Sequence, residues 1–134
     1  MIDGHTWLAG NSSEVSIDGA TAFCNQTVPL NPATDATRTQ MIRCSVRGTS
    51  PNVTIDGVTN GAYDLYLYIW EDNTPQTFSI SLQGGQFFVP NVNSGAAGSW
   101  QRMGPYRIEV LSDWVSIDSF GGYANFSGIE LYSR

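Results

Sequence analysis

The chain is built from short segments of alternating side chains that are punctuated by glycine and asparagine, and no segment shows a sustained helical period with caps. In the longest, Tyr63–Trp70 (YDLYLYIW), leucine and isoleucine share one face, and aspartate, tyrosine and tryptophan share the other. About nine such segments predict an all-β fold, an antiparallel β-sandwich. The predicted strands are Val15–Asp18, Gln40–Val46, Asn52–Val58, Tyr63–Trp70, Thr77–Leu82, Gln86–Val92, Tyr106–Leu111, Trp114–Asp118 and Phe126–Tyr132.

Turn signals lie between these strands. Leu82–Gln86 (LQGGQ) predicts a hairpin with glycines at positive φ, and Asn60-Gly61 predicts a turn before the Tyr63 strand. The most irregular segments are Leu30–Thr39, Asn91–Trp100 and Ser119–Asn125. The sequence contains neither a repeat nor a linker, so residues 1–134 are predicted to form a single domain.

Charge excludes several classes of partner. Twelve carboxylates oppose six arginines, lysine is absent, and the net charge is −6. A nucleic-acid-binding protein needs a basic surface, and the arginines here are scattered along the sequence.

The composition is typical of a secreted domain. No apolar run approaches the ~20 residues of a membrane span. Charged residues are few, and glycine, serine, threonine and asparagine are abundant, which indicates a secreted domain. The abrupt start at residues 1–4 predicts that this domain is fused to a larger protein.

The chain has two cysteines, Cys24 and Cys44, and a single histidine, His5. Zinc requires about four ligands, so this set does not form a zinc site. The alternatives are a disulfide or two free thiols, and the secreted-type composition favours the disulfide. By the chain-entropy model such a bridge stabilises by about 3 kcal/mol.

Three stretches resemble a known family: the opening IDGHTWLAG, the central GAYDLYLYIWEDNTPQTFSISLQG and the closing GGYANFSGIELY. Together they are similar to malectin-like domains and their bacterial relatives, over nearly the whole chain. The resemblance implies a galactose-binding-like jelly roll that binds carbohydrate at the loop end of the sandwich, between aromatic and carboxylate side chains. The matching positions are the loop after Trp70-Glu71 and the segment Gly121–Asn125. The first loop is shorter than in malectin, and the acidic residue of the second has no counterpart.

The segment Trp70-Glu71-Asp72-Asn73 is the strongest local candidate for a sugar site. It ends the longest strand and offers one ring, two carboxylates and an amide, which are the groups that pack on a pyranose and bond to its hydroxyls. Two alternatives remain open. In the first, Trp70 packs inside the protein while Glu71 and Asp72 are exposed turn residues. In the second, Glu71 and Asp72 hold a structural calcium ion. Binding itself is expected to require no cofactor.

Three residues from elsewhere complete the predicted site. Tyr123 and Asn125 follow the glycines at 121 and 122, which permit a tight turn toward the same rim. Arg43, beside Cys44, is a possible neighbour that hydrogen-bonds a sugar or pairs with Glu71, and the ion pair is favoured.

The other aromatic residues have open roles. Tyr66 and Tyr68 form either a flat sugar platform or half-buried packing residues, and packing is favoured because aromatic strand faces are usually covered in such a sandwich. Trp100 either reaches a site or anchors a loop, and Trp114 is expected to be exposed. Trp7 is expected to pack across the end of the sandwich.

Catalysis has little support, since a nucleophilic triad would depend on His5, and Glu109 and Glu130 lie where surface charge is expected. The sequence therefore predicts a non-catalytic carbohydrate-binding module that holds a larger secreted protein to a polysaccharide or oligosaccharide. The alternative is a structural or protein-interaction sandwich, such as an adhesin or spacer module, without a sugar site.

Overall fold

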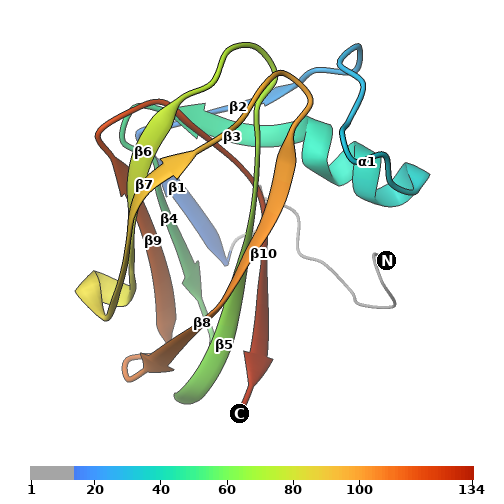
Figure 1. Cartoon of the computed structure of the whole chain (residues 1–134). Coiled ribbons are helices and arrows are strands. Elements are labelled where there is room, and N and C mark those ends of the chain that lie inside the picture. The colour runs from blue at the N-terminus through green and yellow to red at the C-terminus, as the bar shows by residue number, and fades with distance from the viewer. Residues whose placement is uncertain (1–13) are drawn as a thin grey trace.

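A computed structural model describes residues 14–134 as two antiparallel five-stranded sheets that pack face to face (Figure 1). In order, the first sheet contains β1 (Val15–Asp18), β4 (Asn52–Asp56), β9 (Trp114–Phe120), β6 (Thr77–Leu82) and β7 (Phe87–Asn93). The second contains β2 (Thr21–Cys24), β3 (Cys44–Gly48), β10 (Ala124–Ser133), β5 (Gly61–Trp70) and β8 (Trp100–Val110). The chain passes repeatedly between the sheets, and the predicted antiparallel β-sandwich is confirmed.

The core lies between the sheets and uses the apolar half of each alternating strand. Leu65, Leu67 and Ile69 of β5 are fully buried there, against residues such as Ile80 and Ile117 from the first sheet. Burying each side chain of this size stabilises the folded state by about 1.5–3 kcal/mol relative to leaving it exposed to water. The face of β5 that the sequence predicts to be core is therefore confirmed as core.

One helix, α1 (Ala36–Arg43), was not predicted, and it replaces the first half of the strand expected at Gln40–Val46. Asp35 caps it: its Oδ1 accepts a hydrogen bond from Arg38 N at 2.8 Å. The helix has eight residues and buries only Ile42 fully, so it shows no apolar period that a sequence pattern could reveal. No helix within residues 14–134 has the length and apolarity of a membrane span.

Besides shifts of one or two residues at several strand ends, strand positions differ from the prediction at two places. Residues Thr21–Cys24 form β2, which had no predicted counterpart, and β8 begins at Trp100 rather than at Tyr106. Its first half contains Gly104-Pro105, and the ladder with β5 shifts register there, so the alternation is broken. The predicted hairpin after Leu82 is confirmed, with Gly84 and Gly85 at φ 63° and 99°.

The predicted disulfide is also confirmed. Cys24 at the end of β2 and Cys44 at the start of β3 lie directly opposite each other in the ladder and are bonded. The bridge closes the segment that contains α1. No free cysteine occurs in residues 14–134.

Candidate functional site

A hollow of about 260 Å³ lies at the upper end of the sandwich in Figure 1, where the loop between β5 and β6 approaches the turn between β9 and β10. This is the end that the sequence predicts. It brings together side chains from β3, from the loop after β5 and from the turn before β10. The lining residues are Arg47, Glu71, Asp72, Asn73, Thr74, Gln76 and Tyr123.

Glu71 shapes the loop from inside. It is 4% exposed, and its Oε1 accepts from Ser94 Oγ at 2.7 Å while Oε2 accepts from Asn73 N at 3.0 Å. The backbone of Glu71 also bonds to Gly98 and Ser99. These contacts use the carboxylate within the protein, so Glu71 acts as a positioning residue for the loop that carries Asn73.

Asp72 ties three segments together. Its Oδ2 accepts from Asn25 Nδ2 at 3.4 Å, its Oδ1 accepts from Asn125 Nδ2 at 3.3 Å, and Arg47 Nη1 lies 4.0 Å away. The side chain is 14% exposed. The expectation that Asp72 is an exposed turn residue is therefore wrong, because residues distant in sequence bury one side of it.

Asn125 supports the hollow without lining it. Its side chain is buried: Nδ2 donates to Asp72 Oδ1, and its own Oδ1 has no hydrogen-bond partner within residues 14–134. In the β3–β10 ladder it lies opposite Arg47. A ligand contact of Asn125 would have to reach past Asp72.

Tyr123 reaches the rim as the glycines before it predict. Gly121 has φ +83°, and a Cβ on Gly122 would lie 1.9 Å from Thr77 O, so the turn needs glycine at both positions. Tyr123 is 38% exposed and presents a ring at the hollow.

Three polar side chains at the hollow are free to bind. The side chains of Asn73, Thr74 and Gln76 make no hydrogen bond to any other residue between 14 and 134. Thr74 and Gln76 were not predicted, although they follow Asn73 directly in the same loop. Their amides and hydroxyl both donate and accept hydrogen bonds, as sugar hydroxyls do.

Trp70 does not belong to the hollow. It is fully buried, its Nε1 donates to Ser45 Oγ at 3.1 Å, and its ring stacks on Phe23 with centroids 6.2 Å apart. The predicted sugar contact of Trp70 is therefore wrong, and the alternative that it packs inside the protein is confirmed.

The predicted position of Arg43 next to the site is also wrong. As the last residue of α1, it donates from Nε and Nη2 to Val28 O at 3.1 and 2.8 Å, and it does not line the hollow. Its favoured ion pair with Glu71 does not form within residues 14–134, and Arg43 is not placed to contact a sugar in this hollow. Arg47 takes the place expected for Arg43, with its guanidinium 4.1 Å above the ring of Phe23.

The remaining aromatic residues mostly pack. Tyr68 is 1% exposed and stacks against Trp100, which donates from Nε1 to Pro32 O at 2.6 Å. Tyr66 is half-buried, and the guanidinium carbon of Arg102 lies 3.7 Å from the centroid of its ring. The packing interpretation of the two tyrosines is confirmed, and Trp100 anchors the loop before α1. Trp114 is 38% exposed. The predictions for Trp7 and His5 lie outside the described residues.

Beside these rings, the buried carboxylate of Glu130 forms an ion pair with the partly exposed Arg102. Arg102 Nε donates to Glu130 Oε1 at 2.7 Å, and Tyr132 Oη donates to Oε2. Burial alone would raise the pKa of Glu130, but hydrogen bonds from Arg102 and the two tyrosines outweigh it and lower the pKa from 4.5 to about 2. Burial, followed by the neighbouring Glu130, raises the pKa of Tyr68 to about 12.

Glu130 is expected to make stability depend on pH. A carboxylate with a lowered pKa in the folded state stabilises above its unfolded pKa and loses that contribution as the pH falls through its folded pKa. Between pH 5 and pH 2 the wild type should lose about 2–3 kcal/mol more unfolding free energy than Glu130→Gln. Urea titrations across this range measure the difference, and parallel curves for the two proteins would contradict it.

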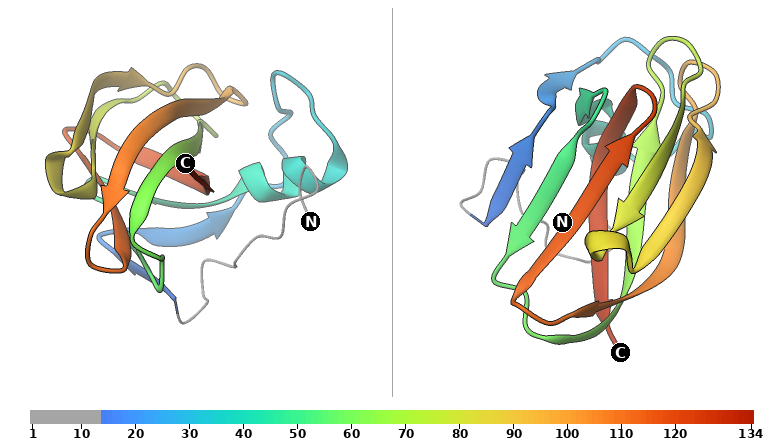
Figure 2. Two further views of the ribbon diagram at one scale, coloured as in Figure 1. Left: turned by 90° about the horizontal axis from the view of Figure 1, so that it is seen from below. Right: turned by 90° about the vertical axis from the view of Figure 1, so that its left-hand side faces the viewer.

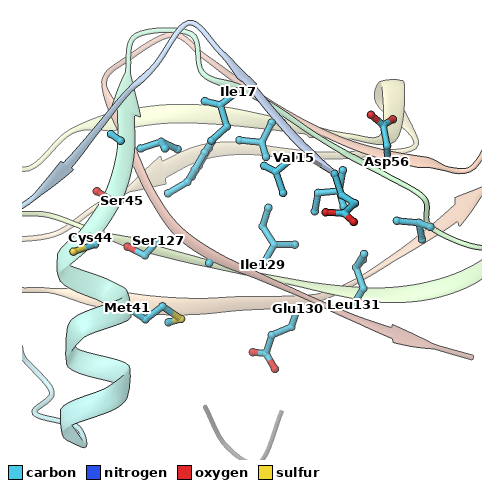
Figure 3. Close-up of a pocket in the computed structure, with 18 of the residues that line it drawn as sticks. Val15, Ile17, Met41, Cys44, Ser45, Asp56, Ser127, Ile129, Glu130 and Leu131 are labelled. Atoms are coloured by element: carbon cyan, nitrogen blue, oxygen red, sulfur yellow. The ribbon is translucent and has the colours of Figure 1, made fainter. Parts of the chain in front are cut away.

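A larger hollow, of about 1110 Å³, lies between the edges of the two sheets (Figure 3). Val15 and Ile17 of β1 face Ile129 and Leu131 of β10 across it, while Glu130 points away. Most of the lining comes from the apolar core faces of the sheets, and Ser45 and Ser127 are among its few polar members, so this hollow offers a sugar fewer hydrogen-bonding groups than the one beside Tyr123.

Comparisons with known proteins bear on the fold. No protein-family model matches the chain, and no curated protein matches it. Among solved structures, it is similar to an exo-β-1,3-galactanase of Phanerochaete chrysosporium with galactose, at TM-score 0.54 and 20% identity. The match covers 87% of this chain but 27% of the galactanase chain, so the chain spans about a quarter of that enzyme's length.

Two similar structures match over almost their whole length. The carbohydrate-binding module TmCBM61 in complex with β-1,4-galactotriose has TM-score 0.53 and 11% identity, covering 91% of this chain and 90% of the module. A family 35 carbohydrate-binding module from Clostridium thermocellum has TM-score 0.53 and 16% identity, covering 90% and 92%. The chain therefore has the galactose-binding-like jelly-roll fold of carbohydrate-binding modules.

Proposed function

We propose that the chain is a non-catalytic carbohydrate-binding module that holds a larger secreted protein to a polysaccharide. The observation that carries this proposal is the hollow itself, where the exposed ring of Tyr123 adjoins the side chains of Asn73, Thr74 and Gln76, which bond to no other residue of the described part of the chain. An aromatic ring packs against the C–H face of a pyranose, and amides and hydroxyls bond to its edge. The disulfide supports secretion, because such bonds persist outside the cytosol.

The charges at the hollow favour a neutral sugar. Glu71 is bonded inside the protein, and Arg47 and Asp72 lie within 4.0 Å of each other, so neither ion is isolated. The similar structures supply the first ligands to test: TmCBM61 holds β-1,4-galactotriose, and the similar galactanase acts on β-1,3-linked galactan. We therefore propose that neutral galactans are the first candidates.

Replacing Tyr123 by alanine is expected to weaken glycan binding by about 1–3 kcal/mol. The variant lacks the ring that packs on the sugar, and the sugar hydroxyls next to it are then no longer held in a fixed geometry.

Asp72→Ala should weaken binding by a similar amount. It should also lower the unfolding free energy by about 1 kcal/mol, because Asn25 and Asn125 lose their acceptor. Calorimetric titration with β-1,4- and β-1,3-galactooligosaccharides measures the affinities, and urea unfolding measures stability.

The matched control is Asp64→Ala, which removes a partly exposed carboxylate near the start of β5, at the end of that strand away from Glu71 and Asp72. It should bind like wild type. If both Tyr123→Ala and Asp72→Ala bind like wild type, the sugar site lies elsewhere. If the wild type binds none of the galactans, mannans, glucans and xylans on affinity gels, the proposed function fails.

We further propose that binding requires no metal ion. The oxygens of Glu71 and Asp72, the candidate calcium ligands, already accept hydrogen bonds from Ser94, from the backbone of Asn73 and from two asparagine amides. In residues 14–134 no group of three or more His, Cys, Asp or Glu side chains gathers that could hold an ion. The titrations should therefore give the same affinity after dialysis against EDTA and after addition of calcium.

A further inference from the structure

The outer face of the first sheet carries exposed aromatic rings. On β9, Val115 and Ile117 enter the core, so the alternate residues lie on the outer face. Two of these, Phe120 and Trp114, are 44% and 38% exposed. Figure 2 (right) shows this sheet from outside, with α1 behind it and, on the near side, only the short 3₁₀ helix η1 (Gln83–Gly85) among the described helices.

Phe88 of β7 joins this face. It is 52% exposed and lies opposite Ser81 of β6, and its ring stacks on that of Phe120 with centroids 5.9 Å apart and planes inclined by 16°. Between the two rings, β6 contributes only Ser79 and Ser81 to the outer face. Because serine is small, the two rings stand above the sheet instead of packing into a cover.

The polar residues around the rings suit a neutral, hydroxyl-rich ligand. They are serine, threonine, asparagine and aspartate, and the five strands of this sheet contain no arginine, since every arginine lies in α1, in the second sheet or at the C-terminus. Protein interfaces are depleted in serine and aspartate, so this composition argues against a protein partner. The carboxylates would repel an anionic polysaccharide. They are Asp18, Asp56 and Asp118.

The rings also adjoin the hollow at the end of the sandwich. Phe120 ends β9, and only Gly121 and Gly122 separate it from Tyr123 at the rim. From Phe120 back to Trp114 the face extends for six residues of strand, or about 20 Å. A chain whose end occupies the hollow could therefore continue over Phe120 and Phe88.

We propose that the outer face of the first sheet, with Phe88 and Phe120 at its centre, is a second contact surface for a neutral polysaccharide chain. This rests on the proposed function, because the same chain occupies the hollow beside Tyr123. The surface adds affinity for long chains and none for ligands short enough to fit the hollow alone.

The test compares Phe88→Ala/Phe120→Ala with wild type, using protein from a bacterial host so that Asn52, part of an Asn-Val-Thr sequon on this face, carries no glycan. Affinity gels containing long-chain β-1,4- or β-1,3-galactan measure polymer binding, and calorimetry with the matching galactotriose measures binding at the hollow. The double variant should bind the polymer about 10-fold more weakly and the trisaccharide unchanged. Leu111→Ala, which removes another exposed apolar side chain, is the matched control.

The outcomes separate this proposal from the one on which it rests. If the wild type binds both ligands and the double variant retains full polymer affinity, the second surface is overturned while the hollow stands. If the variant loses trisaccharide affinity equally, the rings belong to the hollow and the proposal of a separate surface is wrong. Sedimentation that shows a wild-type dimer and a monomeric variant, with polymer binding unchanged, would assign the face to self-association instead.

Discussion

Trp70→Ala is expected to lower the free energy of unfolding by about 3–5 kcal/mol, the usual cost of removing a large aromatic side chain from a protein interior. Trp70 is fully buried, stacks on Phe23 and donates a hydrogen bond to Ser45. Its removal leaves a cavity between β2, β3 and β5, and deprives the buried Ser45 hydroxyl of its donor. The effect arises from packing and involves no lost contact with a ligand.

Urea unfolding followed by circular dichroism measures this loss. Trp70→Phe keeps much of the ring and removes the indole N–H, so it should cost less than the alanine variant. Trp114→Ala provides the matched control, because the same substitution at a 38% exposed position should cost about 1 kcal/mol or less. A Trp70→Ala protein as stable as wild type but unable to bind glycan would show that the indole contacts the ligand.

Trp70 also shows what alternation can and cannot predict. The period of two in β5 separates Leu65 and Leu67 from Tyr68 and Trp70, and the structure has that separation. Alternation does not reveal what covers the second face. The cover comes from Phe23 on β2, Trp100 on β8 and the region of α1, and both β2 and α1 are too short to give a sequence pattern.

The site was predictable where it depends on local geometry. The end of β5 and the two glycines before Tyr123 place loop and ring at one rim, and both signals lie within a few residues of the groups they position. The errors concern groups positioned by distant segments. Arg43 was assigned to a strand, but a helix extends to this residue, and Arg47 reaches the hollow because β3 pairs with β10.

Asp72 illustrates the same limit. In the sequence it is one of several polar residues in an acidic turn, whereas in the structure Asn25 and Asn125 bond to it from the end of β2 and the start of β10. These bonds make Asp72 both a lining group and part of the support for the hollow. The freer groups, Asn73 and Gln76, come from the same loop, which Glu71 holds from within.

Loss of the Cys24–Cys44 disulfide is expected to cost about 3 kcal/mol of unfolding free energy, because the bridge restricts the unfolded chain over a sequence separation of 20 residues. Within residues 14–134, β2 is an edge strand that pairs with β3 alone, and besides this ladder it is held by the stack of Phe23 on Trp70. The enclosed segment is better held, since Arg43 bonds to Val28 O and Trp100 bonds to Pro32 O. The sandwich should therefore still fold without the bridge.

Because Asn25 directly follows Cys24, freeing the end of β2 should also weaken the bond from Asn25 to Asp72 and loosen one wall of the hollow. The variant Cys24→Ala/Cys44→Ala should unfold at lower urea than wild type and bind glycan more weakly at temperatures where it is fully folded. Dithiothreitol should move the wild type toward the variant and leave the variant itself unchanged. Equal unfolding midpoints for oxidised and reduced wild type, with free thiols verified by mass, would show that the contacts of Arg43 and Trp100 hold this segment without the bridge.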